Sequence, residues 1–145
     1  MKLFHGSPFL VDTLESRKPR GDTRFNKASG IYMTSSFVEA SIYALTRDKE
    51  RKNKSWGVKW IDGDVFLILK KSKWKGKNKK YMLNKLGYVY EYDTDKGVQN
   101  PDITRKTEYR INRKKIIPSK IFIVNIDEIK NNIMYLSDQD YDNIW

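Results

Sequence analysis

Two tyrosines, Tyr32 and Tyr43, lie where the sequence pattern changes from that of a strand to that of a helix. Residues 31–34 alternate with the period of two that is typical of a strand, and a helix is predicted to begin at Ser35 or Ser36, both good N-cap residues. If strand and helix deliver the two rings to a common side, they form the walls of a slot for a flat ring. The alternative is that both are ordinary core tyrosines with a hydroxyl at the surface.

The predicted helix carries Phe37, Ala40, Tyr43 and Ala44 on one face, at the spacing of a buried stripe. Glu39 follows the predicted N-cap by about three residues, which is the spacing of a capping box. We therefore expect this helix to pack against a sheet through that face.

The only histidine, His5, ends the first predicted strand, and Gly6, Ser7 and Pro8 are expected to stop that strand. A histidine at the junction of a strand and a loop is positioned by a rigid element, as binding and catalytic residues often are. The alternative is a satisfied surface or core histidine.

The remaining pattern is mostly that of strands. Residues 15–29 are polar and predict a loop. We expect Arg24 and Phe25 of this loop to lie at the binding cleft that Tyr32 and Tyr43 would form. Further strands are predicted at Gly57–Ile61, Asp64–Leu69, Tyr88–Tyr92, Thr107–Ile111 and Lys120–Ile126. Asp62-Gly63 predicts a hairpin between the first two of these. Because strands dominate and one helix stands out, the sequence predicts an α+β domain with a curved or split sheet.

The other segments are predicted to be irregular or short. Residues 93–106 are expected to form a loop, Asp127 is expected to cap a short final helix, and Asp138–Trp145 has the pattern of a tail.

The 145 residues predict one domain over 1–145, with 39% hydrophobic and 13% aromatic residues, as in a globular protein. There is no cysteine for disulfide or thiolate chemistry, and one histidine leaves little for zinc, so we expect no metal. No apolar run approaches the ~20 residues of a membrane span and no leader pattern precedes a cleavage site, so we expect a cytoplasmic monomer.

The net charge of +11 is unevenly distributed. Arg47–Lys85 holds 14 basic against 4 acidic residues, or +10, whereas Lys120–Trp145 holds 2 against 5, or −3. The basic segment interleaves Trp56, Trp60 and Trp74, a pattern that suits phosphate contact with aromatic stacking. A solvated lysine-rich face is the alternative. Residues 47–55 are predicted to be a helix end or a mobile loop, and residues 70–80 a flexible loop.

Three blocks in order carry a resemblance to a known family. They are His5-Gly6-Ser7, then Gly30-Ile31-Tyr32 with Tyr43 after it, and Glu108-Tyr109 at the start of a late strand. Together they resemble the His–Tyr–Glu class of ADP-ribosyltransferases, which includes the catalytic domains of poly(ADP-ribose) polymerases and small bacterial and phage transferases. The blocks span Met1 to about Ile126.

The resemblance implies two small, split antiparallel sheets, with few helices, around a cleft that binds NAD in a bent form. In that reading His5 bonds the nicotinamide-side ribose, Gly6 holds the nicotinamide amide through its backbone, Tyr32 and Tyr43 sandwich the ring, and Glu108 bonds the ribose 2′-hydroxyl and orients the acceptor. The implied catalytic residues are Glu108, His5 and Tyr32. The implied NAD-binding residues are His5, Gly6, Ser7, Arg24, Gly30, Tyr32 and Tyr43.

Two positions depart from the family pattern. Ala40 stands where many polymerases have an amide-bonding serine, and the adjacent Ser41 is expected to face elsewhere. Lys106 stands where the arginine-modifying toxins have Glu or Gln, which argues against that branch. Without the upstream blocks, the preferred interpretation of Glu108 is an exposed strand glutamate in a cross-strand pair with a lysine.

The implied activity is transfer of ADP-ribose from NAD to a macromolecular acceptor with release of nicotinamide. A protein acceptor is slightly favoured over nucleic acid. Cleaving the nicotinamide–ribose bond creates an oxocarbenium-like sugar, which a carboxylate stabilises, and stacked rings hold the leaving group. The open alternatives are an NAD glycohydrolase, an inactive NAD- or nucleic-acid-binding domain, and an RNA 2′-phosphotransferase. The phosphotransferase chemistry resembles a site with several arginines and a second histidine, and this chain has only one histidine, His5.

Overall fold

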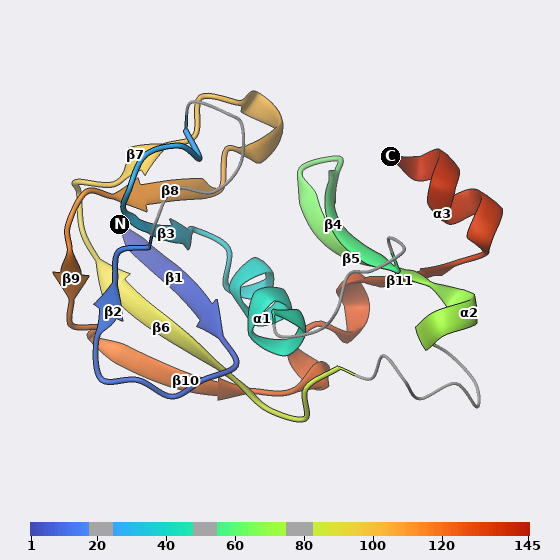
Figure 1. Cartoon of the computed structure of the whole chain (residues 1–145), viewed down its shortest axis with the longest axis horizontal. Coiled ribbons are helices and arrows are strands. Elements are labelled where there is room, and N and C mark those ends of the chain that lie inside the picture. Colours follow the sequence, from blue (N-terminus) through green and yellow to red (C-terminus); the bar gives the residue numbers. More distant parts are fainter. Residues whose placement is uncertain (18–24, 48–54, 75–82) are drawn as a thin grey trace.

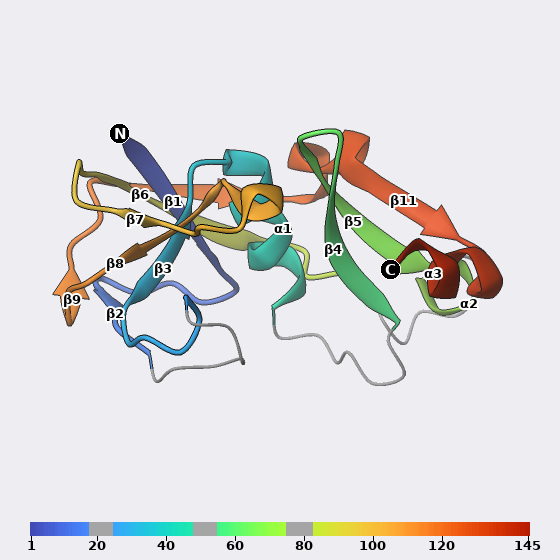
Figure 2. The same cartoon turned by 90° about the horizontal axis from the view of Figure 1, so that it is seen from above.

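The computed structural model describes residues 1–17, 25–47, 55–74 and 83–145. In this part of the chain the strands form three sheets, of six, three and two strands. Helix α1 (Phe37–Thr46) lies between the two larger sheets, as Figures 1 and 2 show from two directions. The α+β class with few helices and mostly antiparallel strands is confirmed.

The large sheet makes up one lobe of the molecule. Its strands, in spatial order, are β10 (Lys120–Val124), β6 (Gly87–Asp93), β1 (Lys2–Ser7), β3 (Ile31–Thr34), β8 (Glu108–Ile111) and β7 (Val98–Gln99). All of its pairings are antiparallel. One face packs on α1. The other covers a core that consists of Leu3, Leu14, Ile31, Met33, Tyr90, Ile111 and Ile116.

The small sheet forms the second lobe, in the order β11 (Ile133–Leu136), β5 (Asp64–Lys70) and β4 (Trp56–Ile61). The predicted hairpin is confirmed: Asp62 and Gly63 have φ angles of 51° and 82°, and two positive φ angles are what a two-residue type I′ turn requires. Strand β11 pairs parallel to β5, so the antiparallel arrangement that the resemblance implies is wrong for this pair, although it holds for the other pairs of described strands. The parallel pair is possible because the chain passes through the large sheet between these two strands.

Helix α1 begins where the sequence predicts. Ser36 is the N-cap, and its hydroxyl accepts a hydrogen bond from the Glu39 backbone N–H at 3.1 Å. Ala40 and Ala44 pack on Val89 and Val124 of the large sheet. Ile42 and Leu45 of the same helix face the small sheet, so the helix is buried on two sides and not only through the predicted stripe.

Several predicted boundaries are wrong. Strand β1 continues through Gly6 to Ser7, so His5 lies inside a strand and not at its end. Residues Lys71–Trp74 form a helical turn, α2, where a flexible loop was predicted, and residues 75–82 lie outside the described part of the chain. Residues 48–54, within the predicted helix end or loop at 47–55, also lie outside it.

The predicted tail is a helix, α3 (Asp138–Ile144), capped by Ser137 and anchored by the buried Tyr141. Residues 138–144 are mostly polar and only Tyr141 is buried, so the sequence has no apolar stripe that would predict this helix.

The remaining elements are short. They are β2 (Leu14–Glu15), β9 (Lys115–Ile116) and the 3₁₀ turns η2 (Ile103–Arg105), η3 (Ile126–Glu128) and η4 (Lys130–Asn132). Strand β7 and turn η2 interrupt the loop predicted over residues 93–106. Asn125, and not Asp127, caps η3.

Two glycines let α1 approach the large sheet. A Cβ placed on Gly6 would lie 1.8 Å from the Ala40 carbonyl oxygen, and one on Gly87 would lie 2.6 Å from the Ala44 Cβ and 2.8 Å from the Ala44 carbonyl oxygen. Because backbone atoms cannot yield as a flexible side-chain end can, the helix position depends on these two residues having no side chain.

We expect Gly87→Ala to lower the free energy of unfolding by about 1–3 kcal/mol, because the added methyl group meets the backbone of α1. Chemical denaturation followed by circular dichroism measures this. Gly97→Ala is the matched control, since its methyl group would meet only side-chain ends, of Leu3 and Tyr109 at 3.1 Å. Equal losses in the two variants would contradict a tight helix–sheet contact at Gly87.

Candidate active site

The large sheet is split between β1 and β3. These strands pair at one position, where Phe4 lies opposite Thr34, whereas β1 pairs with β6 along its whole length. The side chain of His5 fills the gap, with its Nδ1 at 2.8 Å from the carbonyl oxygen of Tyr32. That carbonyl therefore finds a donor on a side chain where a regular sheet would supply a backbone N–H.

The neighbours of His5 determine its tautomer. The Tyr32 carbonyl can only accept, so Nδ1 carries the proton, and Nε2 accepts from Arg47 Nη1 at 3.0 Å. Burial, together with the charges of Arg47 and Arg17, lowers the pKa of His5 to about 4, although the bond to Tyr32 opposes this. The imidazole is neutral at physiological pH and acts as a hydrogen-bonding group, not as a charge.

A cavity of about 440 Å³ opens beside this split. Its lining includes His5 and Gly6 from β1, Tyr32 from β3, Tyr43 from α1 and Glu108 from β8. Residues predicted from blocks more than 100 positions apart in the sequence thus line one space. The cavity also reaches the small sheet through Trp56.

The other predicted site residues lie elsewhere. Ser7 and Gly30 line a second cavity of about 420 Å³, which shares His5, Arg17 and Tyr32 with the first. Arg24 lies outside the described residues.

Tyr32 is held from several sides. Its hydroxyl donates to the carbonyl oxygens of Phe25 and Ala28, and the Phe25 ring meets its ring edge-on at 5.7 Å. The guanidinium of Arg17 lies over the Tyr32 ring, 4.5 Å from its centre. The hydroxyl is hydrogen-bonded within the fold, so the ring is the part of Tyr32 that is left to contact a ligand in the cavity. The planar guanidinium of Arg17 already lies over this ring.

Tyr43 projects from α1 into the same cavity. Burial raises the pKa of Tyr43 above its ordinary value, and the nearby carboxylates of Glu39 and Glu108 raise it further. Tyr43 therefore stays a neutral phenol, with its ring available to a ligand.

Glu108 opens β8 opposite Thr34 of β3. Its Oε2 accepts from Asn100 Nδ2 at 2.8 Å, and its Oε1 lies 3.9 Å from Arg105 Nη1. An amide donor and a guanidinium thus hold the two oxygens of the Glu108 carboxyl group in place.

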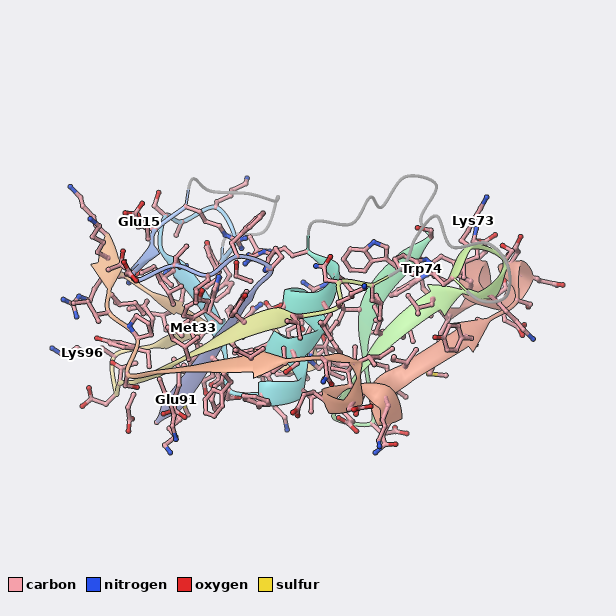
Figure 3. All side chains as sticks on the ribbon, turned by 90° about the horizontal axis from the view of Figure 1, so that it is seen from below. Glu15, Met33, Lys73, Trp74, Glu91 and Lys96 are labelled. Carbon is pink, nitrogen blue, oxygen red and sulfur yellow. The ribbon has the colours of Figure 1, made fainter. Side chains whose placement is uncertain are left out.

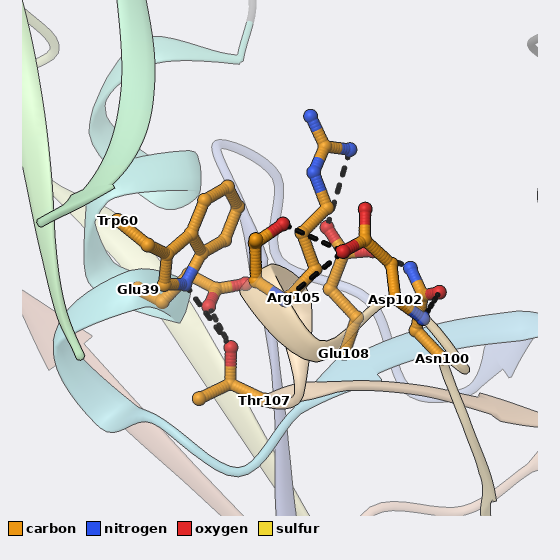
Figure 4. A network of polar contacts seen from close by, with 8 residues as sticks. Glu39, Trp60, Asn100, Asp102, Arg105, Thr107 and Glu108 are labelled. Carbon is orange, nitrogen blue, oxygen red and sulfur yellow. Dashed lines mark hydrogen bonds and ion pairs between the residues drawn. The ribbon is translucent and has the colours of Figure 1, made fainter.

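Sequence reasoning missed a second carboxyl group in the cavity, that of Glu39 (Figure 4). Glu39 was predicted to close a capping box, but its Oε1 accepts from Thr107 Oγ1 at 2.7 Å. The Thr107 hydroxyl in turn accepts from Trp60 Nε1 at 3.2 Å. Helix α1, strand β4 and the residue before Glu108 are thereby joined in one chain of hydrogen bonds.

A sequence signal for Glu39 exists in hindsight. Glu39 precedes Tyr43 by four residues, so the two share a helix face, and a helix that presents Tyr43 to a cavity must present Glu39 too. Burial raises the pKa of Glu39 to about 7, with the charge of Glu108 adding to the effect and the hydroxyl of Thr107 opposing it.

Ala40, which departs from the family pattern, and its neighbour Ser41 do not line the cavity. Ala40 is buried against the large sheet, beside Gly6. The Ser41 hydroxyl donates to the Phe37 carbonyl oxygen at 2.9 Å, which agrees with the expectation that it faces elsewhere. Neither residue offers a hydroxyl to a ligand in the cavity.

The tryptophans of the basic segment are engaged in the fold. Trp56 is 5% exposed, Trp60 bonds Thr107, and Trp74 Nε1 donates to the Ser55 carbonyl oxygen at 2.9 Å. Figure 3 shows Trp74 beside the strands of the small sheet while Lys73 points outward. Phosphate contact by the segment 47–85 stays a prediction, and much of that segment lies outside the described residues.

Within the described ranges, no three His, Asp or Glu side chains gather in a way that could hold a metal ion. None of the helices in the same ranges is long and apolar enough to cross a membrane. No family model matches this chain, and no curated protein or solved structure matches it either.

The raised pKa of Glu39 gives a pH-dependent stability. The unfolded chain has the ordinary value of 4.5 and the folded protein about 7, so the fold prefers the protonated carboxyl. The associated stability is fully present below pH 4.5 and is lost as the pH rises through about 7. We therefore expect the free energy of unfolding of Glu39→Gln, relative to that of the wild type, to rise by about 2–3 kcal/mol as the pH is raised from about 5 to about 8.

Urea unfolding of both proteins across this pH range measures the difference. Glu15→Gln is the control, because Glu15 is exposed and its ion pair with Lys115 lies at the surface. A difference between Glu39→Gln and wild type that does not change with pH would show that Glu39 has an ordinary pKa.

Proposed function

We propose that this chain is an NAD-dependent mono-ADP-ribosyltransferase, which transfers ADP-ribose to a macromolecular acceptor and releases nicotinamide. The observation that carries the proposal is the convergence of His5, Tyr32, Tyr43 and Glu108, from four different elements, on one cavity. The three sequence blocks contain all four of these residues.

We propose with it that the fold is of the ADP-ribosyltransferase type. Two features support this. The large sheet splits at His5, and a second, smaller sheet lies across α1 from it (Figure 2). The cavity is lined by residues of both sheets. The resemblance implies two small sheets around an NAD cleft.

In the proposed reaction the nicotinamide ring lies between Tyr32 and Tyr43. The Tyr32 ring already carries the planar cation of Arg17, and the pyridinium of NAD is also a planar cation. Breaking the bond between ribose C1′ and the pyridinium nitrogen returns the electron pair to the ring, which leaves as neutral nicotinamide. An acceptor oxygen or nitrogen then forms the new bond to C1′ and loses its proton.

Glu108 supplies the negative charge that this transition state requires. Positive charge develops on the sugar as the C1′ bond breaks, and a positioned carboxylate stabilises that charge without moving. Asn100 and Arg105 fix both oxygens of Glu108, and the anchored Thr107 precedes it in the chain. The neutral His5 would serve as a hydrogen-bonding partner for a ribose hydroxyl.

An RNA 2′-phosphotransferase is the second candidate, because one observation favours it. Arg17, Arg47 and Arg105 all line the cavity with His5, as that chemistry would need. The chain has no second histidine. Loss of phosphate from a 2′-phosphorylated RNA in the presence of NAD would support this candidate over protein modification.

Incubation of the protein with labelled NAD and a cell lysate tests the main proposal. Label that survives nuclease and not protease indicates a protein acceptor, and the converse indicates nucleic acid. Free ADP-ribose as the only product indicates an NAD glycohydrolase. No release of nicotinamide under any of these conditions would contradict the proposal and leave a binding domain.

We expect Glu108→Gln to slow nicotinamide release by about 10²–10³, because the amide keeps the size and hydrogen bonding of the side chain and removes its charge. Glu128→Gln, at an exposed position, is the control. Unchanged release by a Glu108→Gln protein with an unchanged melting temperature would show that Glu108 has a structural role only.

We expect Tyr32→Ala to weaken NAD binding by about 1–2 kcal/mol, the scale of a lost aromatic contact with its burial. Tyr32→Phe should bind NAD like the wild type, because it keeps the ring and gives up only the hydroxyl bonds to Phe25 and Ala28. Isothermal titration calorimetry measures both. Equal binding by wild type and Tyr32→Ala would exclude stacking on this ring.

A further inference from the structure

Strand β10 forms one edge of the large sheet. It stands at the end of the strand order, so among the described strands it pairs with β6 alone. Figure 1 shows it along the outer side of that lobe. An edge strand presents every second backbone N–H and C=O group away from its own sheet, and these groups can pair with a strand of another chain.

The features that commonly protect an edge strand are weak on β10. Edge strands are often very short, or carry a charged residue or a proline within them. Strand β7, at the other edge of the same sheet, is two residues long, and β4, at an edge of the small sheet, has Lys59 near its centre. Strand β10 is five residues long, and its four residues after Lys120 are all apolar. The edge at β10 is therefore suited to pairing.

The side chains of β10 divide between the two faces of the sheet. Phe122 and Val124 pack toward α1. Ile121 and Ile123 lie on the opposite face, each directly across from a tyrosine of β6, and they are 42% and 67% exposed. Two isoleucines two positions apart thus place an exposed apolar patch along an edge whose backbone can accept another strand.

We propose that the edge of β10 is a dimer interface, in which β10 of a second copy pairs antiparallel with it and joins the two six-stranded sheets. Pairing centred on Phe122 uses all five residues of both strands and places Ile121 of each copy opposite Ile123 of the other. Centring the pair on another residue leaves the ends of both strands unpaired and separates these isoleucines. The strand is thus complementary to itself in one register, as a two-fold interface requires.

The charges at the two ends of β10 select the antiparallel direction. The strand begins at the exposed Lys120, and the turn η3 that follows it carries the exposed Asp127 and Glu128. In an antiparallel pair the basic start of each strand lies near the acidic turn of the other copy. A parallel pair would set Lys120 against Lys120 and the two acidic turns against each other, and like charges side by side destabilise a strand pair. A second copy of the chain therefore matches this edge in both shape and charge.

This interface lies away from the candidate active site. Strands β6 and β1 separate β10 from the split between β1 and β3, and none of the residues of β10 lines the cavity. The inference therefore goes beyond the proposed function and does not require NAD cleavage. It departs from the monomer expected from the sequence, because a local pattern does not show which strand will end a sheet.

Sedimentation velocity over a series of protein concentrations tests the interface. We expect the wild type to show a monomer–dimer equilibrium, and Ile123→Lys to raise the dissociation constant of the dimer at least about tenfold, because the new charge would lie against Ile121 of the other copy. Ile103→Lys is the matched control. Ile103 is 86% exposed and follows β7, the opposite edge strand, so this variant should dimerise like the wild type. Circular dichroism checks that both variants fold.

Cysteine cross-linking tests the register, since the chain has no cysteine of its own. We expect a mixture of Ile121→Cys and Ile123→Cys proteins to form a disulfide-linked dimer under mild oxidation, because directly opposite Cα atoms lie about 4.5–5.5 Å apart, within the span of a disulfide. Either variant alone should cross-link at least about tenfold more slowly, since its two cysteines would lie on a diagonal, about 7–8 Å apart.

Three results would overturn the proposal. A wild type that stays monomeric up to its solubility limit would exclude the second copy and leave the edge to a strand of a different protein. Equal dissociation constants for Ile123→Lys and Ile103→Lys would place the dimer contact elsewhere. Cross-linking of Ile121→Cys with itself as fast as in the mixture would contradict the register.

These outcomes are separate from those that test the proposed function, because none of the measurements uses NAD. A dimer through β10 in a protein that never releases nicotinamide would support the interface and overturn the transferase. Nicotinamide release by a protein that is monomeric at every concentration would do the reverse.

Discussion

The bond from His5 Nδ1 to the Tyr32 carbonyl oxygen is the interaction on which the site depends. It holds β1 and β3 together at the point where their backbone pairing stops after a single position. A fully paired sheet would have no opening here, and a split without a bridging side chain would leave a buried carbonyl without a donor. The histidine therefore allows β1 and β3 to separate while the Tyr32 carbonyl oxygen still accepts a hydrogen bond. Because this bond requires Nδ1 to be protonated, it also fixes which nitrogen faces Arg47.

Helix α1 acts as the spacer between the two lobes, and its residues divide by size and polarity accordingly. The small residues Ala40 and Ala44 let it lie against Gly6 and Gly87 of the large sheet. Larger apolar residues of the helix fill the space toward the small sheet. The part of the helix that faces neither sheet carries Glu39 and Tyr43 to the cavity. The close helix–sheet contact thus determines how far these two groups reach into the site.

Both carboxyl groups and guanidiniums line the site. Glu39 and Glu108 lie together near the start of β8, joined through Thr107 and Trp60 to the small sheet (Figure 4). Arg17 and Arg47 lie around His5, where the sheet splits. Arg105 lies between Glu108 and the Trp60 ring, 5.3 Å from its centre.

The sequence by itself determined what local patterns encode. The strand at 31–34, the helix capped by Ser36 and the hairpin at Asp62-Gly63 follow from periodicity, capping and turn chemistry, which depend on neighbours within a few residues. Residues that the spaced blocks marked for chemistry, among them His5 and Glu108, do line one cavity.

Only the tertiary structure decided the features that depend on residues far apart in the chain. Glu39 has the local signature of a cap, yet its carboxyl is buried and bonded to Thr107, 68 residues away. Arg17 and Arg47 belong to polar stretches without a pattern, and the fold brings both to the cavity beside His5. The parallel pairing of β11 with β5 also spans about half the chain. Local sequence cannot encode such contacts, because their free energy comes from burial and charge that exist only once the sheets have assembled around α1.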